Sequence, residues 1–341
     1  MSNEYILLGM ENPLLDISAV VDMEFLEKYG LNVNDAILAE EKHMPIYEEI
    51  QSRYKVDYLA GGAAQNTLRG AQYMLPPKST VYIGCVGKDD AASILQKEAA
   101  KDGLLTEYLV DETAPTGRCA VLITTANRSL VTSLASANNY KISHLKSERI
   151  WKIVENAKYY YIGGYFLTVS PDSAMAVAQH AAEKGKTFMM NLSAPFIPKF
   201  FGQHVDELMP YIDVLFGNES EADAYADAKK LGTNDVAEIA LHIAALPKKT
   251  SKPRLVVFTQ GTHPTIVAYE GKATIYPIIK VAASKIVDTN GAGDAFCGGF
   301  LSQYVQGKSI EQCVAGGLHL ASIVVQRSGP TYPQEKSTFS F

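Results

Sequence analysis

Residues 288–296 read Asp-Thr-Asn-Gly-Ala-Gly-Asp-Ala-Phe and place a carboxylate directly after a glycine-rich turn. Glycines carry no Cβ, so the backbone can bring the N–H groups of Gly291, Ala292 and Gly293 close to a ligand. If Asp294 opens a helix, these N–H groups lie at the positive end of the helix dipole, which attracts anions. A carboxylate beside an anion site suits a base that deprotonates a hydroxyl. The alternative is a plain turn with an aspartate cap.

Polar side chains also follow two strands predicted in the N-terminal part of the chain. The first strand leads into a turn-like segment that contains Asn12 and Asp16. A later strand ends in a glycine pair whose second member is Gly62, and Asn66 lies one turn into the following helix. In α/β folds, ligands bind outside the carboxyl ends of the strands. We therefore expect these four residues to face a ligand, although a simple turn and close helix packing would explain the same residue types.

Three further residues have side chains suited to a phosphate or a metal ion. Arg128 lies at the end of a predicted hairpin, from which its guanidinium could reach across to a phosphate; a solvated turn arginine is the alternative. Asn218 and Glu221 follow another strand and are one helical turn apart, so they share a face. Two oxygen-bearing groups so placed suit a hydrated Mg²⁺. A helix-capping pair would show the same spacing.

The composition excludes several classes of partner. The chain has 341 residues, of which 47% are hydrophobic and 20% charged, and its net charge is -6. It contains no Lys/Arg-rich block and no basic-aromatic patch, so we expect no nucleic-acid partner. No apolar run approaches the roughly 20 residues of a membrane span, and no signal peptide precedes the first strand. We expect a cytoplasmic monomer without a membrane partner, and a nuclear presence stays open.

The four cysteines are scattered through apolar contexts and form no C-x-x-C pair. This pattern favours reduced, buried thiols over disulfides or a zinc site. Cys297 follows Asp294 by three residues, and we interpret it as a packed helix cysteine in preference to a reactive thiol.

Strand and helix patterns alternate along most of the chain and predict an α/β fold with a doubly wound, mostly parallel sheet. Two stretches, 17–61 and 116–140, break this alternation, and we interpret them as a small β-rich lid domain inserted into the main domain. The large α/β domain is then expected to comprise residues 1–16, 62–115 and 141–341. The chain after about Gln334 is expected to be loose.

Three common catalytic motifs are absent from the sequence. It contains no G-x-x-x-x-G-K-[ST], no H-E-x-x-H and, after the first strand, no G-x-G-x-x-G. P-loop NTPase, zincin and dinucleotide oxidoreductase functions therefore lose their usual support. What remains is an anion site with an adjacent carboxylate on the carboxyl side of an α/β sheet.

The sequence resembles the ribokinase-like (PfkB-type) carbohydrate kinases over nearly its whole length. The resemblance rests on the strings at 12–18, 61–62, 65–66, 127–130, 166–171, 191–195, 216–219 and 288–296. The last string marks the family. The strings at 12–18 and 191–195 are similar to a branch of the family whose acceptor is adenosine.

This resemblance implies transfer of the γ-phosphate of ATP to the 5'-hydroxyl of adenosine, giving AMP and ADP in purine salvage, with Mg²⁺. It implies Asp294 as the base and the N–H groups of residues 291–293 as the anion hole. Arg128 would come down with the lid onto the transferring phosphoryl group. Asn218 and Glu221 would govern the metal through water. ATP contacts are implied for Asn218, Thr259, Gly261, Thr289, Gly291 and Gly293.

The resemblance also implies a set of contacts to the nucleoside. Asp16 would accept both ribose hydroxyls, which two carboxylate oxygens can do. Gly62 and Asn66 would complete the ribose contacts, with Asn12 beside the nucleoside. Phe166 would stack on adenine. The apolar walls of the pocket would be Leu14, Leu38, Leu130 and Leu134.

Two other functions compete with this interpretation. A kinase for a free sugar would have polar groups in place of the leucines and Phe166, because a bare sugar would leave apolar walls hydrated. A catalytically silent nucleoside-binding protein on the same scaffold would tolerate the loss of Asp294 or of the glycines, and all of these are present.

Overall fold

The computed structural model describes residues 5–33, 36–124, 127–337 and 339. The strands of its larger sheet are β1 (Leu7–Met10), β5 (Thr80–Gly87), β6 (Leu105–Asp111), β9 (Tyr159–Gly163), β10 (Thr187–Asn191), β11 (Val214–Asn218), β12 (Leu255–Gln260), β13 (His263–Tyr269) and β14 (Lys272–Tyr276). They lie in the order β14-β13-β12-β11-β10-β9-β1-β5-β6. All neighbours from β12 to β6 are parallel, and β13 and β14 add antiparallel strands at one edge. The predicted doubly wound, mostly parallel sheet is confirmed.

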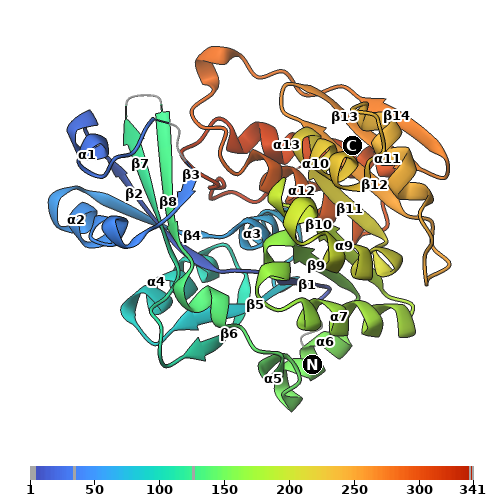
Figure 1. The fold of residues 1–341 in the computed structure, drawn as a ribbon, viewed down its shortest axis with the longest axis horizontal. Coiled ribbons are helices and arrows are strands. Elements are labelled where there is room, and N and C mark those ends of the chain that lie inside the picture. Colours follow the sequence, from blue (N-terminus) through green and yellow to red (C-terminus); the bar gives the residue numbers. More distant parts are fainter. Residues whose placement is uncertain (1–4, 34–35, 125–126, 338, 340–341) are drawn as a thin grey trace.

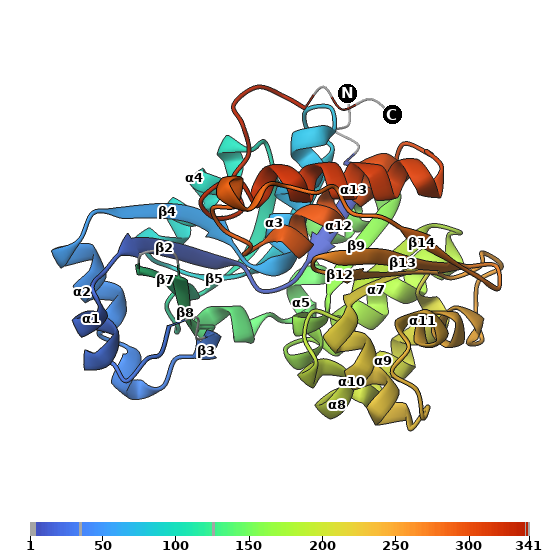
Figure 2. The same ribbon diagram turned by 90° about the horizontal axis from the view of Figure 1, so that it is seen from above.

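Helices cover both faces of this sheet, as Figures 1 and 2 show. One face carries α3 (Ala63–Met74), α12 (Ala292–Tyr304) and α13 (Ile310–Val324). The opposite face carries α6 (Glu148–Asn156), α7 (Pro171–Glu183), α9 (Gly202–Leu208), α10 (Glu219–Lys229) and α11 (Val236–Ala245), with the short α5 (Ile142–Leu145) and α8 (Phe196–Phe200) beside them. None of the described helices is long and apolar enough to cross a membrane.

The central strand β1 is buried on both of its faces. Leu7 packs into the core beneath α3, α12 and α13, and its neighbour Leu8 packs into the core on the opposite face. Successive side chains of a strand point to opposite faces, so a parallel strand between two helix layers is apolar at every position. This explains why the N-terminal strand is a continuous apolar run.

The four cysteines are buried and unpaired, as expected.

The second sheet contains β2 (Leu14–Val20), β3 (Ala36–Leu38), β4 (Val56–Gly61), β7 (Arg118–Thr124) and β8 (Asn127–Ser133), in the order β3-β8-β7-β2-β4. It lies to the left of the main sheet in Figure 1, with α1 (Met23–Lys28) and α2 (Ile46–Arg53) beside it. The helix α4 (Asp90–Lys101) contacts strands of both sheets. The expectation of a turn through Asp16 is wrong, because β2 begins at Leu14. The predicted domain boundary after residue 16 therefore falls inside a strand.

Two elements carry weak local signals and were not predicted from the pattern. The strand β6 lies at the edge of the sheet, and most of its side chains are only partly buried. The helix α10 buries mainly alanines, together with Tyr225, so its apolar periodicity is low. Periodicity predicts an element only when one face is clearly more apolar than the other.

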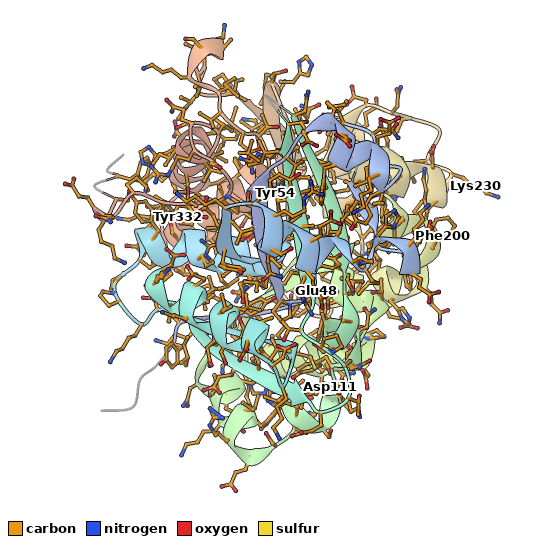
Figure 3. All side chains as sticks on the ribbon, turned by 90° about the vertical axis from the view of Figure 1, so that its left-hand side faces the viewer. Glu48, Tyr54, Asp111, Phe200, Lys230 and Tyr332 are labelled. Carbon is orange, nitrogen blue, oxygen red and sulfur yellow. The ribbon has the colours of Figure 1, made fainter. Side chains whose placement is uncertain are left out.

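The C-terminal segment is packed against α3, so the expectation of a loose end from Gln334 is wrong for the described residues. The Tyr332 ring stacks on Tyr73, with the ring centroids 5.2 Å apart, and Figure 3 shows it beside α3. Lys336 Nζ donates to the carbonyls of Gln72 and Leu75 at 2.9 and 3.1 Å. A lysine at these positions satisfies the open carbonyls at the end of α3.

Candidate active site

The N-terminus of α12 differs from the prediction in one respect. The helix begins at Ala292, and its N-cap is Gly291 in the left-handed region with φ +75°. Asp294 is therefore the third residue of the helix, and the alternative of an aspartate cap is wrong. A left-handed φ favours glycine. The carboxylate thus projects from the first turn, beside the backbone donors of the helix end.

The backbone before Asp294 has room for an anion. A Cβ on Gly293 would meet no atom within 4 Å, so this position borders open space. The N–H of Ala292 donates to the Thr289 carbonyl at 3.3 Å, a long bond that an anion would have to replace. Thr289 itself is exposed. The three predicted anion-hole residues therefore lie together at one helix N-terminus.

Asp294 is bonded to a residue far away in the sequence. Asn66 Nδ2, on α3, donates to Asp294 Oδ2 at 3.1 Å, although the two residues are 228 positions apart. Burial raises the pKa of Asp294 to about 6, while the Asn66 hydrogen bond and the charge of Arg69 lower it. The carboxyl thus changes its charge close to neutral pH and is suited to proton exchange.

Asp16 is the second carboxyl of the site. Its side chain lies directly against Gly61, since a Cβ on that glycine would lie 2.1 Å from Asp16 Oδ1. Burial raises the pKa of Asp16 to about 7; the Arg69 charge lowers it and the Asp294 charge raises it. Since the Asp294 charge acts on Asp16 and the Arg69 charge acts on both carboxyls, Asp16 and Asp294 lie in one electrostatic neighbourhood.

Gly62 joins β4 to α3 in a backbone conformation that favours glycine. Its φ is +94°, and a Cβ would lie 2.3 Å from the carbonyl oxygen of Asn12. A side chain at this position would therefore separate the end of β1 from the start of α3. Asn12 is buried beside this contact. The structure thus brings the predicted residues Asn12, Gly62 and Asn66 together.

Glu11 is a third carboxyl at this site, and it was not predicted. It is 1% exposed, and its Oε2 accepts a hydrogen bond from the Ala64 N–H at 2.8 Å, in the first turn of α3. The carboxyl also lies against Gly163, whose Cβ would be 1.7 Å from Glu11 Oε1. Burial raises the pKa of Glu11 to about 8, the Ala64 amide lowers it, and the Asp294 charge raises it. At neutral pH this side chain is therefore mainly an uncharged acid.

Arg128 lies on β8 of the small sheet and reaches the glycine-rich segment. Its Nε is 3.2 Å from Asp288 Oδ2, and its Nη2 donates to Ser328 Oγ at 2.8 Å. The Arg128 side chain is 14% exposed and that of Asp288 is 5% exposed. The alternative of a solvated turn arginine is wrong, because this guanidinium is held across the gap between the two sheets.

The residues predicted to line an apolar pocket are not equally accessible. Leu14, Leu130 and Leu134 are half-buried, and Leu14 and Leu134 both approach Gly117 closely. Leu38 is 65% exposed on β3. Phe166, in the 3-10 helix η3 (Gly164–Thr168), has no exposed surface and packs on Tyr140 with a centroid separation of 5.3 Å. Stacking on a ligand would need this ring to become accessible.

Asn218 and Glu221 form the reciprocal cap of α10. Asn218 Oδ1 accepts the Glu221 N–H at 2.9 Å, and Glu221 Oε2 accepts the Asn218 N–H at 3.0 Å. Burial raises the pKa of Glu221 to about 7, the Asn218 amide lowers it, and Glu219 and Asp294 raise it. Among the described residues, no group of three or more acidic, histidine or cysteine side chains could enclose a metal ion. A hydrated ion that keeps most of its waters is compatible with this pair.

The other residues predicted to contact ATP lie near the ends of the same strands. Thr259 is at the end of β12, and it pairs in register with Asn218. Gly261 follows in an exposed turn with φ +54°. Both are therefore near the carboxyl ends of neighbouring parallel strands, where α/β folds bind ligands.

Two functional candidates, Glu11 and Arg69, were missed from the sequence. Arg69 is 3% exposed, lies one turn after Asn66 on α3, and donates from Nη1 to Asn66 Oδ1 at 3.1 Å. The i to i+3 spacing places both side chains on one face of the helix and was the available signal. Glu11 had no such signal, because the groups it contacts lie on α3 and β9, which are distant from it in the sequence.

The geometry combines the titrating Asp294 carboxylate, a helix N-terminus open to anions and the half-buried Arg128, which is paired with Asp288 just before that helix. A carboxylate can accept a proton from a hydroxyl while backbone amides and a guanidinium stabilise the charge of a phosphoryl group.

Comparisons with known proteins agree with this chemistry. The model of the pfkB family of carbohydrate kinases matches residues 23–337. The chain is 52% identical over 332 residues to adenosine kinase 2 of Arabidopsis thaliana, covering 97% of this chain and 96% of that protein. It is 48% identical over 340 residues to adenosine kinase of Schizosaccharomyces pombe, covering 99% of both. The crystal structure of Anopheles gambiae adenosine kinase in complex with P1,P4-di(adenosine-5) tetraphosphate matches with a TM-score of 0.89 and 45% identity, covering 98% of this chain and 99% of that one. The chain belongs to the pfkB family of carbohydrate kinases.

Proposed function

We propose that this protein transfers the γ-phosphate of ATP to the 5'-hydroxyl of adenosine, giving AMP and ADP. The observation that carries the proposal is the Asp294 carboxylate, held at 3.1 Å by Asn66 beside the N-terminus of α12. Relatives of 48–52% identity over nearly the whole chain are adenosine kinases, which supports the nucleoside as acceptor. The location in the cytoplasm and the monomeric state remain predictions.

In this reaction Asp294 is the base. Its pKa of about 6 leaves it mostly ionised at neutral pH, so it can accept the proton of the 5'-hydroxyl. A carboxylate is a weak base, but a loose phosphoryl-transfer transition state releases the hydroxyl proton late. The amides of residues 291–293 stabilise the negative charge that develops on the phosphoryl oxygens.

The nucleoside is held by the residues around Gly62. Asp16 accepts the two ribose hydroxyls, and Asn12, Gly62 and Asn66 border the same space. Half-buried leucines of the small sheet form the apolar side of the pocket, and the exposed Leu38 joins them when the lid closes over the substrate. Closure excludes water, which would otherwise compete with the nucleoside as acceptor.

Mg²⁺ is proposed as the companion of ATP. The pair Asn218 and Glu221 would act on it through water, since their own hydrogen bonds cap α10 and leave no protein cage among the described residues. Mg²⁺ favours such sites, in which one or two carboxylates act with substrate phosphates. When bound, the ion neutralises charge on the phosphate oxygens. Thr259, Gly261 and Thr289 complete the proposed ATP contacts.

An assay of ADP release with adenosine, guanosine, inosine and ribose tests this function. We expect turnover with adenosine and at most slow turnover with ribose, because ribose leaves the leucine walls hydrated. Turnover with ribose and none with adenosine would contradict the proposal and favour a sugar kinase.

A variant of the base separates catalysis from binding. Asp294→Asn should lower kcat at least a thousandfold while adenosine binding, measured by calorimetry, stays within a fewfold. Asp90→Asn is the matched control, because Asp90 also lies in the first turn of a helix but is exposed on α4. A large loss of adenosine binding in Asp294→Asn would make Asp294 a substrate anchor instead of the base.

A further inference from the structure

A continuous series of hydrogen-bonded side chains connects the surface of the protein to Asp294. Asp102, the C-cap of α4, accepts from Arg69 Nε at 2.6 Å. Arg69 Nη1 donates to Asn66 Oδ1 at 3.1 Å, and Asn66 Nδ2 donates to Asp294 Oδ2 at 3.1 Å. The same Arg69 nitrogen donates to the carbonyl of Ala60. The Asp102 side chain is 24% exposed and that of Arg69 only 4%.

The chemistry of each group determines which atom donates and which accepts in this series of hydrogen bonds. An arginine has donors only, so the Asn66 amide must turn its oxygen toward Arg69. The amide nitrogen of Asn66 then necessarily faces Asp294. Without Arg69, the amide could turn by 180° and present its oxygen to the carboxylate, which would replace an attraction by a repulsion.

Arg69 also supplies positive charge among buried acids. It lowers the pKa of both Asp16 and Asp294, against the burial that raises them. The guanidinium lies 5.9 Å from the centre of the Tyr332 ring, within the packed interior. A charge this poorly solvated acts strongly on its neighbours.

We propose that Arg69 is a positioning residue for phosphoryl transfer, which orients the Asn66 amide toward the base and keeps the base ionised, with Asp102 moderating its charge. This inference rests on the proposed function, since it takes Asp294 as the base. Arg69 itself is a buried helix residue, and it acts on the base through Asn66.

The test is the acid limb of the pH profile of kcat for three variants of the full-length protein. In Arg69→Gln the limb should move to higher pH by about one unit, because the base loses a nearby positive charge. In Asp102→Asn it should move to lower pH by a smaller amount, because Arg69 is then less compensated. In Arg69→Lys the limb should stay near that of the wild type, while the plateau of kcat falls about tenfold because one ammonium cannot replace the planar fork.

Opposite shifts distinguish this role from a merely structural one. Arg69→Gln and Asp102→Asn both break the same partly buried ion pair. A structural role would therefore lower stability and kcat in both variants and leave their two acid limbs at the same pH. The proposal would be overturned if the acid limbs of Arg69→Gln and Asp102→Asn lay at the same pH, or if both moved in the same direction from the wild-type position. If Arg69→Gln does not fold, an Asp102→Asn limb at or above the wild-type position also overturns it.

Several other groups that titrate or carry charge face these side chains, and none of them is substituted in the three variants. Lys336 faces Asp102. Those that influence Asp294 and Arg69, or are influenced by them, are Glu11, Asp16, Tyr82, Tyr108, Tyr161, Tyr165, Glu221, Cys297 and Tyr332. Arg149→Gln, which breaks the surface ion pair with Glu107, is the matched control and should leave the limb in place. Turnover in Asp294→Asn would contradict the proposed base, whereas an unmoved limb with an inactive Asp294→Asn would contradict only the role of Arg69.

Discussion

Arg128 Nε lies 3.2 Å from Asp288 Oδ2, which ties the small sheet to the glycine-rich segment before α12. Asp288 is held in turn, since its Oδ1 accepts the Asn290 N–H at 3.0 Å and its Oδ2 accepts the Gly329 N–H at 2.8 Å. The arginine is therefore held at Asp288, three to five residues before the proposed anion-hole residues 291–293. We expect this guanidinium to act on a phosphoryl group bound at residues 291–293.

Replacing this arginine should lower the rate of transfer more than the binding of substrate. In Arg128→Gln we expect kcat to fall at least a hundredfold, because a charge that stabilises the phosphoryl oxygens in the transition state is lost. The KM for adenosine should change only a fewfold. Steady-state kinetics measure both. Arg53→Gln on α2 is the control, since Arg53 is an exposed arginine of the small domain that pairs with Glu49 on the same helix. An unchanged kcat in Arg128→Gln would show that Arg128 only joins the sheets.

The rate should fall in acid as Asp294 takes up a proton. Because burial raises the pKa of Asp294 to about 6, kcat of the wild type should be nearly constant above pH 7 and decrease about tenfold for each pH unit well below 6. Saturating ATP and adenosine keep binding from contributing to the profile. A rate that stays constant down to pH 4.5 would contradict Asp294 as the base.

The protein without ligands should be less stable at pH 8 than at pH 6. The pKa values of Glu11, Asp16 and Glu221 are raised to about 8, 7 and 7 in the folded state, so the native protein binds more protons than the unfolded chain between pH 4.5 and 8. Their favourable contribution is complete below the unfolded pKa and is lost as the pH rises through the folded value. Calorimetry should show a lower Tm at pH 8 than at pH 6.

The variant Glu11→Gln identifies the source of this pH dependence. Glutamine keeps an acceptor for the Ala64 N–H but does not ionise, so the difference in Tm between pH 6 and pH 8 should shrink. Glu112→Gln, at an exposed position paired with Lys88, should leave that difference unchanged. If Glu11→Gln keeps the full difference in Tm, Glu11 is not its source.

Adding one methyl group at Gly62 should damage both stability and catalysis. In Gly62→Ala, the new Cβ would lie 2.3 Å from the carbonyl oxygen of Asn12 at a φ of +94°, so the free energy of unfolding should fall by about 2–4 kcal/mol. The displaced start of α3 should also move Asn66 away from Asp294 and lower kcat. Gly202→Ala is the control, since its Cβ would meet nothing within 4 Å and its φ is not left-handed. Equal stability of the two variants, measured by urea unfolding, would contradict this account.

The sequence alone determined the class of the fold and the nature of the site. Apolar runs and helix signals alternate at short range, so the α/β class with a mostly parallel sheet was predicted from them. The glycines and carboxylate at 291–294 are contiguous, and their conformational freedom and charge are properties of the residues themselves. Elements such as β6 and α10 were not predicted, because their burial depends on neighbouring elements and leaves little pattern in the local sequence.

Only the tertiary structure decided which groups touch. Asn66 and Asp294 are 228 residues apart, and their hydrogen bond exists because α3 and α12 pack side by side on one face of the sheet. The same packing buries Arg69 next to Asn66 and encloses Glu11 between α3 and the end of β9. Burial and long-range contacts set the charge of an acid, so a carboxylate and an arginine that look ordinary in the sequence acquire their roles only when the chain has folded around them.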